Sequence, residues 1–126
     1  MKKLLMVAIF LLIPLRTVAW ADNDNYVLLT KEQIAAIDLV SNSRVSAKNG
    51  DMSVDEFLKK AMKEEKRKGN LMMVIGWFPS EKTKTTQNVI YGYNENRQQR
   101  KAEWQVDLKT RRVKAVDDMA KMISGP

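Results

Sequence analysis

The chain contains no cysteine and no histidine among its 126 residues. These two absences exclude disulfide bonds, a thiol nucleophile, a zinc site built from Cys and His, and a Ser-His catalytic pair. Aspartate and glutamate are the strong acid–base groups that remain, and the length suits one domain. The function classes left open are binding, structural contact, or an enzyme built on carboxylates.

Residues 1–21 have the pattern of a signal peptide. Two lysines precede an apolar run at 4–15, and Ala19 and Ala21 supply the small-x-small pattern that signal peptidase recognises. The run is shorter than the roughly 20 residues that span a bilayer. We therefore predict cleavage after Ala21 and a periplasmic or secreted bacterial protein. Retention of the segment as an N-terminal anchor is the alternative.

Loss of this signal changes the charge of the chain. Three of the 22 Lys and Arg residues and none of the acids lie in 1–21, so the net charge falls from +7 to +4. Residues 22–26 are polar, residues 22–29 are predicted to be a flexible mature N-terminus, and 30–126 are predicted to form a single α+β domain. Because this exported domain has no cysteine, packing must supply its stability.

Two capping boxes mark helix starts. Thr30 with Gln33 predicts a helix from 31 to about 42, and Ser53 with Glu56 predicts a second, amphipathic helix at 54–68. Basic residues load the end of this second helix, and Gly69 is placed to end it. The residues of the first helix expected to face the core are Ile34, Ile37 and Val40.

Beyond Gly69 the apolar period changes from 3.6 to 2, which indicates strands. The predicted strands are 71–78 (ended by Pro79), a segment carrying Val89, Tyr91 and Tyr93, then 102–108 and 112–116. The predicted connections are polar, at 80–86, 94–99 and 109–111. Asp117 then caps a C-terminal helix. The order α-α-β-β-β-β-α predicts an antiparallel four-stranded meander with the long helix packed on one face.

The predicted strand 71–78 is apolar on both faces. Strict alternation places one set on one face, Leu71, Met73, Ile75 and Trp77, and a second set on the other, Met72, Val74, Gly76 and Phe78. A sheet with one helical layer needs only one apolar face. The second face must therefore be covered by the short helices, by a protein partner or second subunit, or by a small ligand.

Residues 51–116 resemble small exported cystatin-like modules and PepSY-type modules. The resemblance is carried by a capped helix with Ser53 and Phe57, followed by a meander whose segment 104–110 (WQVDLKT) turns back into Val113. Arg111 stands where such turns usually have glycine. The resemblance implies a helix packed on a sheet and a protein that binds or inhibits other proteins. It transfers no active residues.

We predict a non-enzymatic module that acts through protein–protein contact, as an inhibitor, an adaptor or an accessory part of an envelope assembly. Its partner is an unidentified envelope or secreted protein, with a homodimer as an open alternative and no nucleic acid. An aromatic anchor beside a polar loop is typical of such an interface. The candidate partner-binding residues are Trp77, Phe78, Asn94, Asn96 and Arg97.

The alternative function is binding of anionic envelope polymers or of a membrane surface through basic patches. The residues that would form these patches are Lys59, Lys63, Lys66, Arg67, Arg111 and Arg112. Acids interleave the helical run, which is also typical of an ordinary solvated helix face.

No catalytic group, metal or cofactor is predicted. Glu103 and Asp107 lie four residues apart on one strand, about 13 Å at roughly 3.3 Å per residue, which is farther than paired glycosidase carboxylates. The segment 22–25 (DNDN) begins like a calcium loop, but Val27 and Gln33 stand where such a loop has glycine and glutamate.

Overall fold

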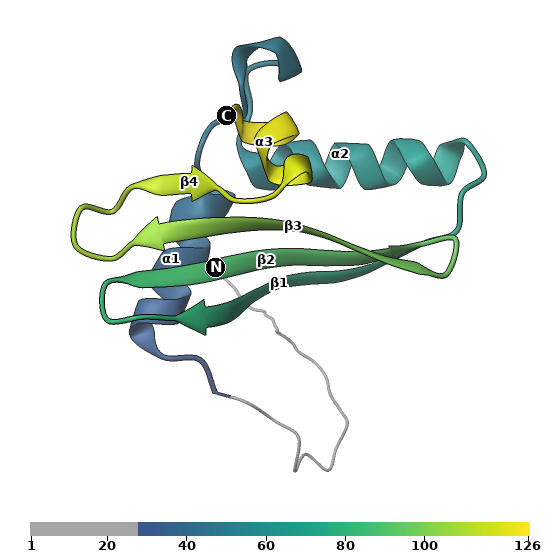
Figure 1. Cartoon of the computed structure of the whole chain (residues 1–126). Helices are drawn as coiled ribbons and strands as arrows, with labels where there is room; N and C mark the ends of the chain where they lie inside the picture. The colour runs from purple at the N-terminus through teal and green to yellow at the C-terminus, as the bar shows by residue number, and fades with distance from the viewer. Residues whose placement is uncertain (1–27) are drawn as a thin grey trace.

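The computed structural model describes residues 28–126, so the predicted signal peptide and its cleavage after Ala21 lie outside the described part, as do residues 22–27. The elements are labelled in Figure 1. They are α1 (Lys31–Ser41), the short 3-10 helix η3 (Ala47–Asn49), α2 (Val54–Arg67), β1 (Met72–Lys82), β2 (Thr86–Glu95), β3 (Gln98–Asp107), β4 (Val113–Ala115) and α3 (Asp118–Ser124). The predicted order of helices and strands is confirmed.

The four strands form one antiparallel sheet in the order β1-β2-β3-β4. Each strand pairs with its neighbour in sequence, because short turns leave no room for a crossover. The α+β class and the antiparallel meander are therefore as predicted. β1 and β4 are the two edges of this sheet (Figure 1).

Both capping boxes form as predicted. The Thr30 and Ser53 side chains accept from the backbone N–H groups of Gln33 and Glu56, and each partner side chain bonds back to the cap. α2 ends in a Schellman motif, in which Gly69 has a φ of 101° and donates to the Lys66 carbonyl. Hydrogen bonds between residues close in sequence thus determine where these helices begin and where α2 ends.

The inward face of α1 differs from the prediction at one residue. Val40 is fully buried and Ile37 packs against the core, but Ile34 is exposed, and Ala36 takes the buried position instead. The buried stripe follows Ala36 and Val40, which are four apart on one helix face. Ile34 lies at the margin of that stripe.

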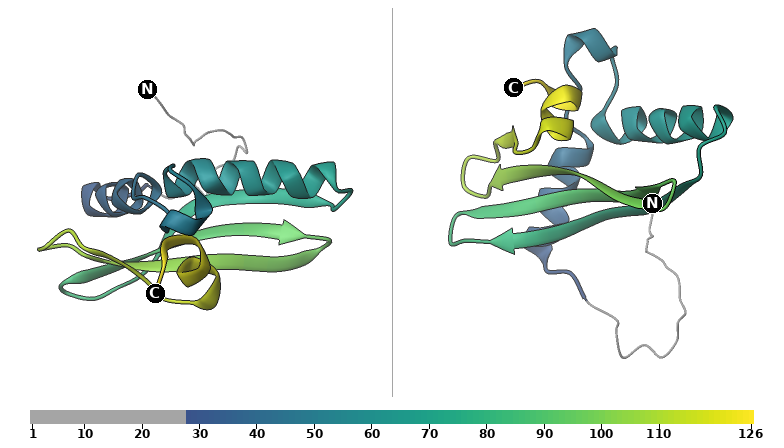
Figure 2. Two further views of the ribbon diagram at one scale, coloured as in Figure 1. Left: turned by 90° about the horizontal axis from the view of Figure 1, so that it is seen from above. Right: turned by 45° about the vertical axis from the view of Figure 1, so that its right-hand side comes forward.

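The hydrophobic core lies between the sheet and the layer formed by α1 and α2, which Figure 2 shows on one side of the strands. Its centre is aromatic. The Trp77 ring lies 5.1 Å from that of Tyr91 and 5.4 Å from that of Trp104, measured between centroids. The predicted inward alternation of β2 and β3 is confirmed, with buried side chains at Val89, Tyr91, Tyr93, Ala102, Trp104 and Val106.

The C-terminal helix closes the core at the β4 edge. Ala120 and Ile123 are fully buried, and the Trp104 indole N–H donates to Ser124 Oγ at 2.9 Å. Asp117 caps α3 as predicted, by accepting from the backbone N–H of Ala120. The helix is held on its other side by Asn49, whose side-chain amide donates to the carbonyl of Ile123.

β1 departs from the strict alternation that the sequence suggested. The pairing to β2 shifts between Val74 and Gly76, and Gly76 has a φ of 105°. This β-bulge adds one residue, so the faces of the strand exchange beyond it. Trp77 therefore faces the core with Met72 and Val74, while Phe78 faces the opposite side; the predicted assignment of these two aromatic residues to faces was wrong.

Pro79 does not end this strand. β1 continues to Lys82 with a second register shift after Pro79. An edge strand tolerates proline because one of its two sides forms no ladder hydrogen bonds. The predicted loop 80–86 therefore shortens to a tight connection, in which the Thr83 N–H donates to the Thr86 carbonyl.

Candidate functional site

The face of the sheet that points away from α1 and α2 carries an exposed apolar surface along β1. Met73, Ile75 and Phe78 are 63%, 52% and 37% exposed. They border Gly92 and Ile90 of β2, because Met73 pairs with Asn94 and Phe78 pairs with Ile90. We call this surface the outer patch and define it by its members, Met73, Ile75, Phe78, Ile90 and Gly92.

Because Gly92 has no side chain, the side chains of Phe78 and Ile75 can pack over the backbone of β2 at this position. A Cβ built on Gly92 would lie 3.1 Å from Phe78 Cε1 and 3.6 Å from Ile75 Cβ. A side chain at position 92 would therefore require the Phe78 ring to shift by a few tenths of an ångström. The glycine thus brings an aromatic and a β-branched side chain together over the backbone of the sheet.

Trp77, the other aromatic residue of β1 chosen from the sequence, points the opposite way. Its indole N–H donates to Asp55 Oδ1 at 2.9 Å, which ties the middle of β1 to the first turn of α2. The ring is only partly exposed and packs on Tyr91 and Trp104. Burial also raises the pKa of the Tyr91 phenol well above its ordinary range. Trp77 thus holds the strand that presents Phe78.

The hairpin tip between β2 and β3 is a two-residue turn. Asn96 and Arg97 have φ angles of 51° and 70°, as a type I′ turn requires. Asn96 is engaged within the fold, because its N–H donates to the Leu71 carbonyl at 2.7 Å and its Oδ1 accepts from the Leu71 N–H at 2.9 Å. Arg97 is exposed, and Asn94 is half-buried opposite Met73. Of the three predicted tip residues, Asn94 borders the outer patch, Arg97 is exposed at the turn, and Asn96 is bonded to Leu71.

The β3 side of the same face is polar, and its groups bond to one another. Lys101 Nζ lies 2.8 Å from Glu103 Oε1 and 3.3 Å from Asp117 Oδ2. The hydrogen bond to Glu103 is the largest cause that raises the pKa of Lys101 above its ordinary value. The Asn88 amide donates to the second oxygen of Glu103 at 2.7 Å. These polar side chains therefore already have hydrogen-bond or ion-pair partners within the fold.

The carboxylates considered for catalysis have structural partners. Glu103 belongs to the network above, and Asp107 Oδ1 accepts from the backbone N–H groups of Lys109 and Thr110 at 2.9 Å each. The bond to Thr110 is the first cause that lowers the pKa of Asp107. Between residues 28 and 126, no three acidic side chains gather closely enough to hold a metal ion.

The basic residues lie in two sets, one on α2 and one on the β3–β4 turn. On α2, Lys59 pairs with Asp55 at 3.0 Å, Arg67 pairs with Glu64, and Lys63 and Lys66 are exposed. The second set, Arg111 and Arg112, lies on the β3–β4 turn, where neither has an ion-pair partner among the described residues.

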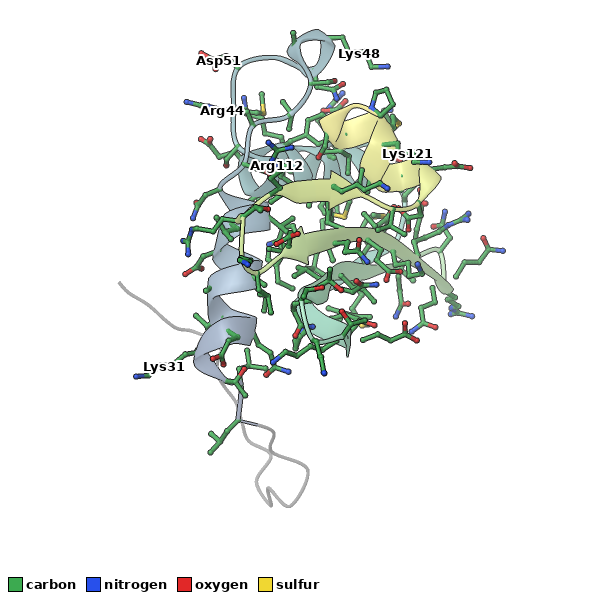
Figure 3. The ribbon with its side chains drawn as sticks, turned by 60° about the vertical axis from the view of Figure 1, so that its left-hand side comes forward. Lys31, Arg44, Lys48, Asp51, Arg112 and Lys121 are labelled. Atoms are coloured by element: carbon green, nitrogen blue, oxygen red, sulfur yellow. The ribbon has the colours of Figure 1, made fainter. Side chains whose placement is uncertain are left out.

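The turn that carries Arg111 and Arg112 adjoins the β1–β2 connection, since the Leu108 N–H donates to the Thr85 carbonyl. Figure 3 shows Arg112 together with Lys31, Arg44, Lys48 and Lys121, which are spread over separate elements. The predicted basic residues themselves lie on two separate parts of the fold, α2 and the β3–β4 turn.

Sequence reasoning missed Gln87, the one polar side chain buried in the core of the described residues. Its Nε2 donates to the carbonyls of Ser80, Glu81 and Asn88, while its Oε1 has no partner within residues 28–126. Gln87 therefore fixes the irregular end of β1. Extending the Val89 alternation back by two residues would have placed it inward.

Comparison with protein families, with curated proteins and with solved structures returned no match. The resemblance to cystatin-like and PepSY-type modules stays a prediction. None of the helices within residues 28–126 has the length and apolar character needed to cross a membrane.

Proposed function

We propose that this chain is an exported, non-enzymatic binding module that makes protein–protein contact through the outer patch. One observation carries the proposal: three large apolar side chains, Met73, Ile75 and Phe78, stand exposed side by side on β1, an edge strand. Exposed contiguous apolar surface of this kind marks contact sites. The partner is an envelope or secreted protein that presents apolar side chains to the patch.

The surroundings of the patch support contact over catalysis. Phe78 supplies an aromatic group seated on Gly92, and the polar β3 side, whose groups bond to one another, supplies a rim. An apolar centre with a polar rim is the usual anatomy of an interface. Nearby carboxylates such as Glu103 already accept hydrogen bonds from their own neighbours.

A photo-crosslinker tests this contact directly. Phe78 is replaced by p-benzoylphenylalanine, which keeps an aromatic ring at that site, and the variant is expressed with its signal in a Gram-negative host. We expect one discrete adduct after irradiation, and we expect Ile75→Glu in the same chain to abolish it. The matched control carries the crosslinker at Val116, which is 41% exposed outside the patch.

Equal adducts from positions 78 and 116, or none from position 78, would contradict the proposal. The adduct's mass separates a foreign partner from a second copy of the chain. Fractionation of the same cells tests the predicted export.

A second candidate function is binding to anionic envelope polymers or lipid headgroups through the β3–β4 turn. It is favoured by Arg111 and Arg112, because neither is within ion-pair distance of an acid in the described part of the chain. Binding of this kind should weaken steeply as salt rises toward physiological strength, because exposed charges are screened. Contact at the outer patch should be insensitive to the same change.

A further inference from the structure

The sheet has one long open edge and one short covered edge. β1 has 11 residues, and no strand within residues 28–126 pairs on its far side. β4 has three residues, and α3 packs against it and against β3. An unpaired strand edge readily adds another strand. This sheet can therefore grow at β1 and not at β4.

The backbone groups that face outward from β1 can be identified. Leu71 directs both its N–H and its carbonyl toward Asn96 of the β2–β3 hairpin. Consecutive residues of a strand direct these groups to alternate sides. Met72 and Val74 therefore present theirs to the open edge, before the bulge that begins at Ile75.

Apolar side chains flank this edge on both faces. Leu71, Met73 and Ile75 are exposed on the outer face, and Val74 is exposed on the helix side. No charged residue occurs from Leu71 to Ser80. The segment therefore offers no cationic side chain that could bind a polyanion. A lipid surface would have to desolvate the unpaired backbone groups, which is unfavourable. A second strand satisfies both the backbone and the side chains.

We infer that the occupant is a second copy of this chain, with residues 71–75 of the two copies paired antiparallel about a two-fold axis at Met73. Met72 then exchanges both backbone hydrogen bonds with Val74 of the partner copy. On the outer face Leu71 lies opposite the partner's Ile75, and the two Met73 side chains face each other. Apolar groups meet apolar groups at every position, as a self-complementary interface requires.

The pairing gives a closed dimer and not a filament. It consumes the β1 edge of both copies, and the edges left at the ends of the resulting eight-stranded sheet are the short β4 strands beside α3. The bulge at Ile75 and Gly76, and Pro79 beyond it, confine the pairing to the first part of β1. Met73 and Ile75 belong to both the paired segment and the outer patch, whereas Phe78 lies outside the paired segment, so Phe78 variants distinguish the dimer from the proposed partner contact.

The test measures the molecular mass in solution of the chain without its predicted signal, residues 22–126. We expect a dimer by light scattering after gel filtration. Met73→Glu and Met73→Lys should each give a folded monomer, because like charges then face each other across the axis. An equal mixture of the two variants should restore a dimer containing one of each. Met122→Glu, at a methionine that is 48% exposed on α3, should remain dimeric.

A single cysteine supplies an independent measurement in this cysteine-free chain. Directly opposed residues that do not exchange hydrogen bonds have Cα atoms about 4.5 Å apart, which a disulfide can bridge. Met73→Cys should form a linked dimer quickly under mild oxidant, and Met122→Cys should not. Phe78→Ala should leave the dimer intact even if it abolishes partner capture. A monomeric wild-type chain at the highest soluble concentration, or a dimer that survives Met73→Glu, would overturn the inference.

Discussion

The two edge strands of this sheet are built in opposite ways. β4 is short, its Ala115 is buried, and α3 closes the core beside it. β1 is long, and its first half exposes Met73, Val74 and Ile75. One edge is protected by the fold and the other is left apolar and open, although both belong to the same core. We therefore propose that residues near β4 serve stability and that the exposed residues of β1 serve contact.

Replacing isoleucine by alanine beside each edge should give the largest difference between the two edges. Ile123→Ala removes a fully buried side chain beside β4 and should lower the free energy of unfolding by about 2–4 kcal/mol. Ile75→Ala removes a half-exposed side chain on β1 and should change it by less than about 1 kcal/mol. Urea unfolding of the two variants measures both effects. Equal losses of stability would show that β1 is an ordinary part of the core.

Removing the hydrogen bond between β1 and α2 should give the next largest change in the free energy of unfolding. Trp77→Phe keeps a ring in the aromatic cluster but removes the hydrogen bond to Asp55, and we expect a loss of about 1–2 kcal/mol. A double-mutant cycle with Asp55→Ala should recover a coupling of that order, because the pair interacts directly. A coupling energy near zero would mean that the stability lost in Trp77→Phe comes from changed packing and not from the hydrogen bond.

A substitution at the hairpin tip should stabilise the fold. Arg97 adopts a left-handed φ of 70°, which glycine adopts without steric cost. Arg97→Gly creates the Asn-Gly pair that type I′ turns favour and should raise the free energy of unfolding by about 0.5 kcal/mol. If partner capture falls while stability rises, Arg97 contributes to recognition. Arg111→Gly, at a φ of 63° near β4, is the matched control.

The smallest expected effect is a dependence on pH. The Ser53 N–H donates to Glu56 and lowers the pKa of that carboxyl below its ordinary value of 4.5. Because the folded pKa is the lower one, this contribution to stability is complete above about pH 4.5 and is lost as pH falls through the folded value. Glu56→Gln should remove that part of the acid dependence. Thermal unfolding from pH 3 to 7 makes the comparison, and an unchanged slope would contradict it.

Local chemistry in the sequence was enough to predict most of the fold. Capping residues such as Ser53 located the helices, and the alternation around Tyr91 and Trp104 identified the buried faces of β2 and β3. Signals of this kind act within a few residues and do not depend on what packs against them. The order of the strands followed from the short turns between them.

The details of β1 could not be predicted in the same way. The bulge at Gly76 exchanged the faces of Trp77 and Phe78, and an isolated glycine in an apolar run does not reveal such a shift. Pro79 is tolerated because β1 is an edge strand, which depends on the topology of the whole sheet. An apolar strand with two apolar faces could be predicted at 71–78, but which of its residues face outward was decided by tertiary pairing.

Amide hydrogen exchange tests the central claim, that β1 is where this protein makes contact. The chain without its predicted signal, residues 22–126, is compared when dilute and isolated with the same chain when concentrated or mixed with envelope extract. We predict slower exchange in a peptide covering 71–78 and unchanged exchange in one covering 113–116. Protection that appears near β4 instead, or no change in 71–78 under either condition, would contradict it.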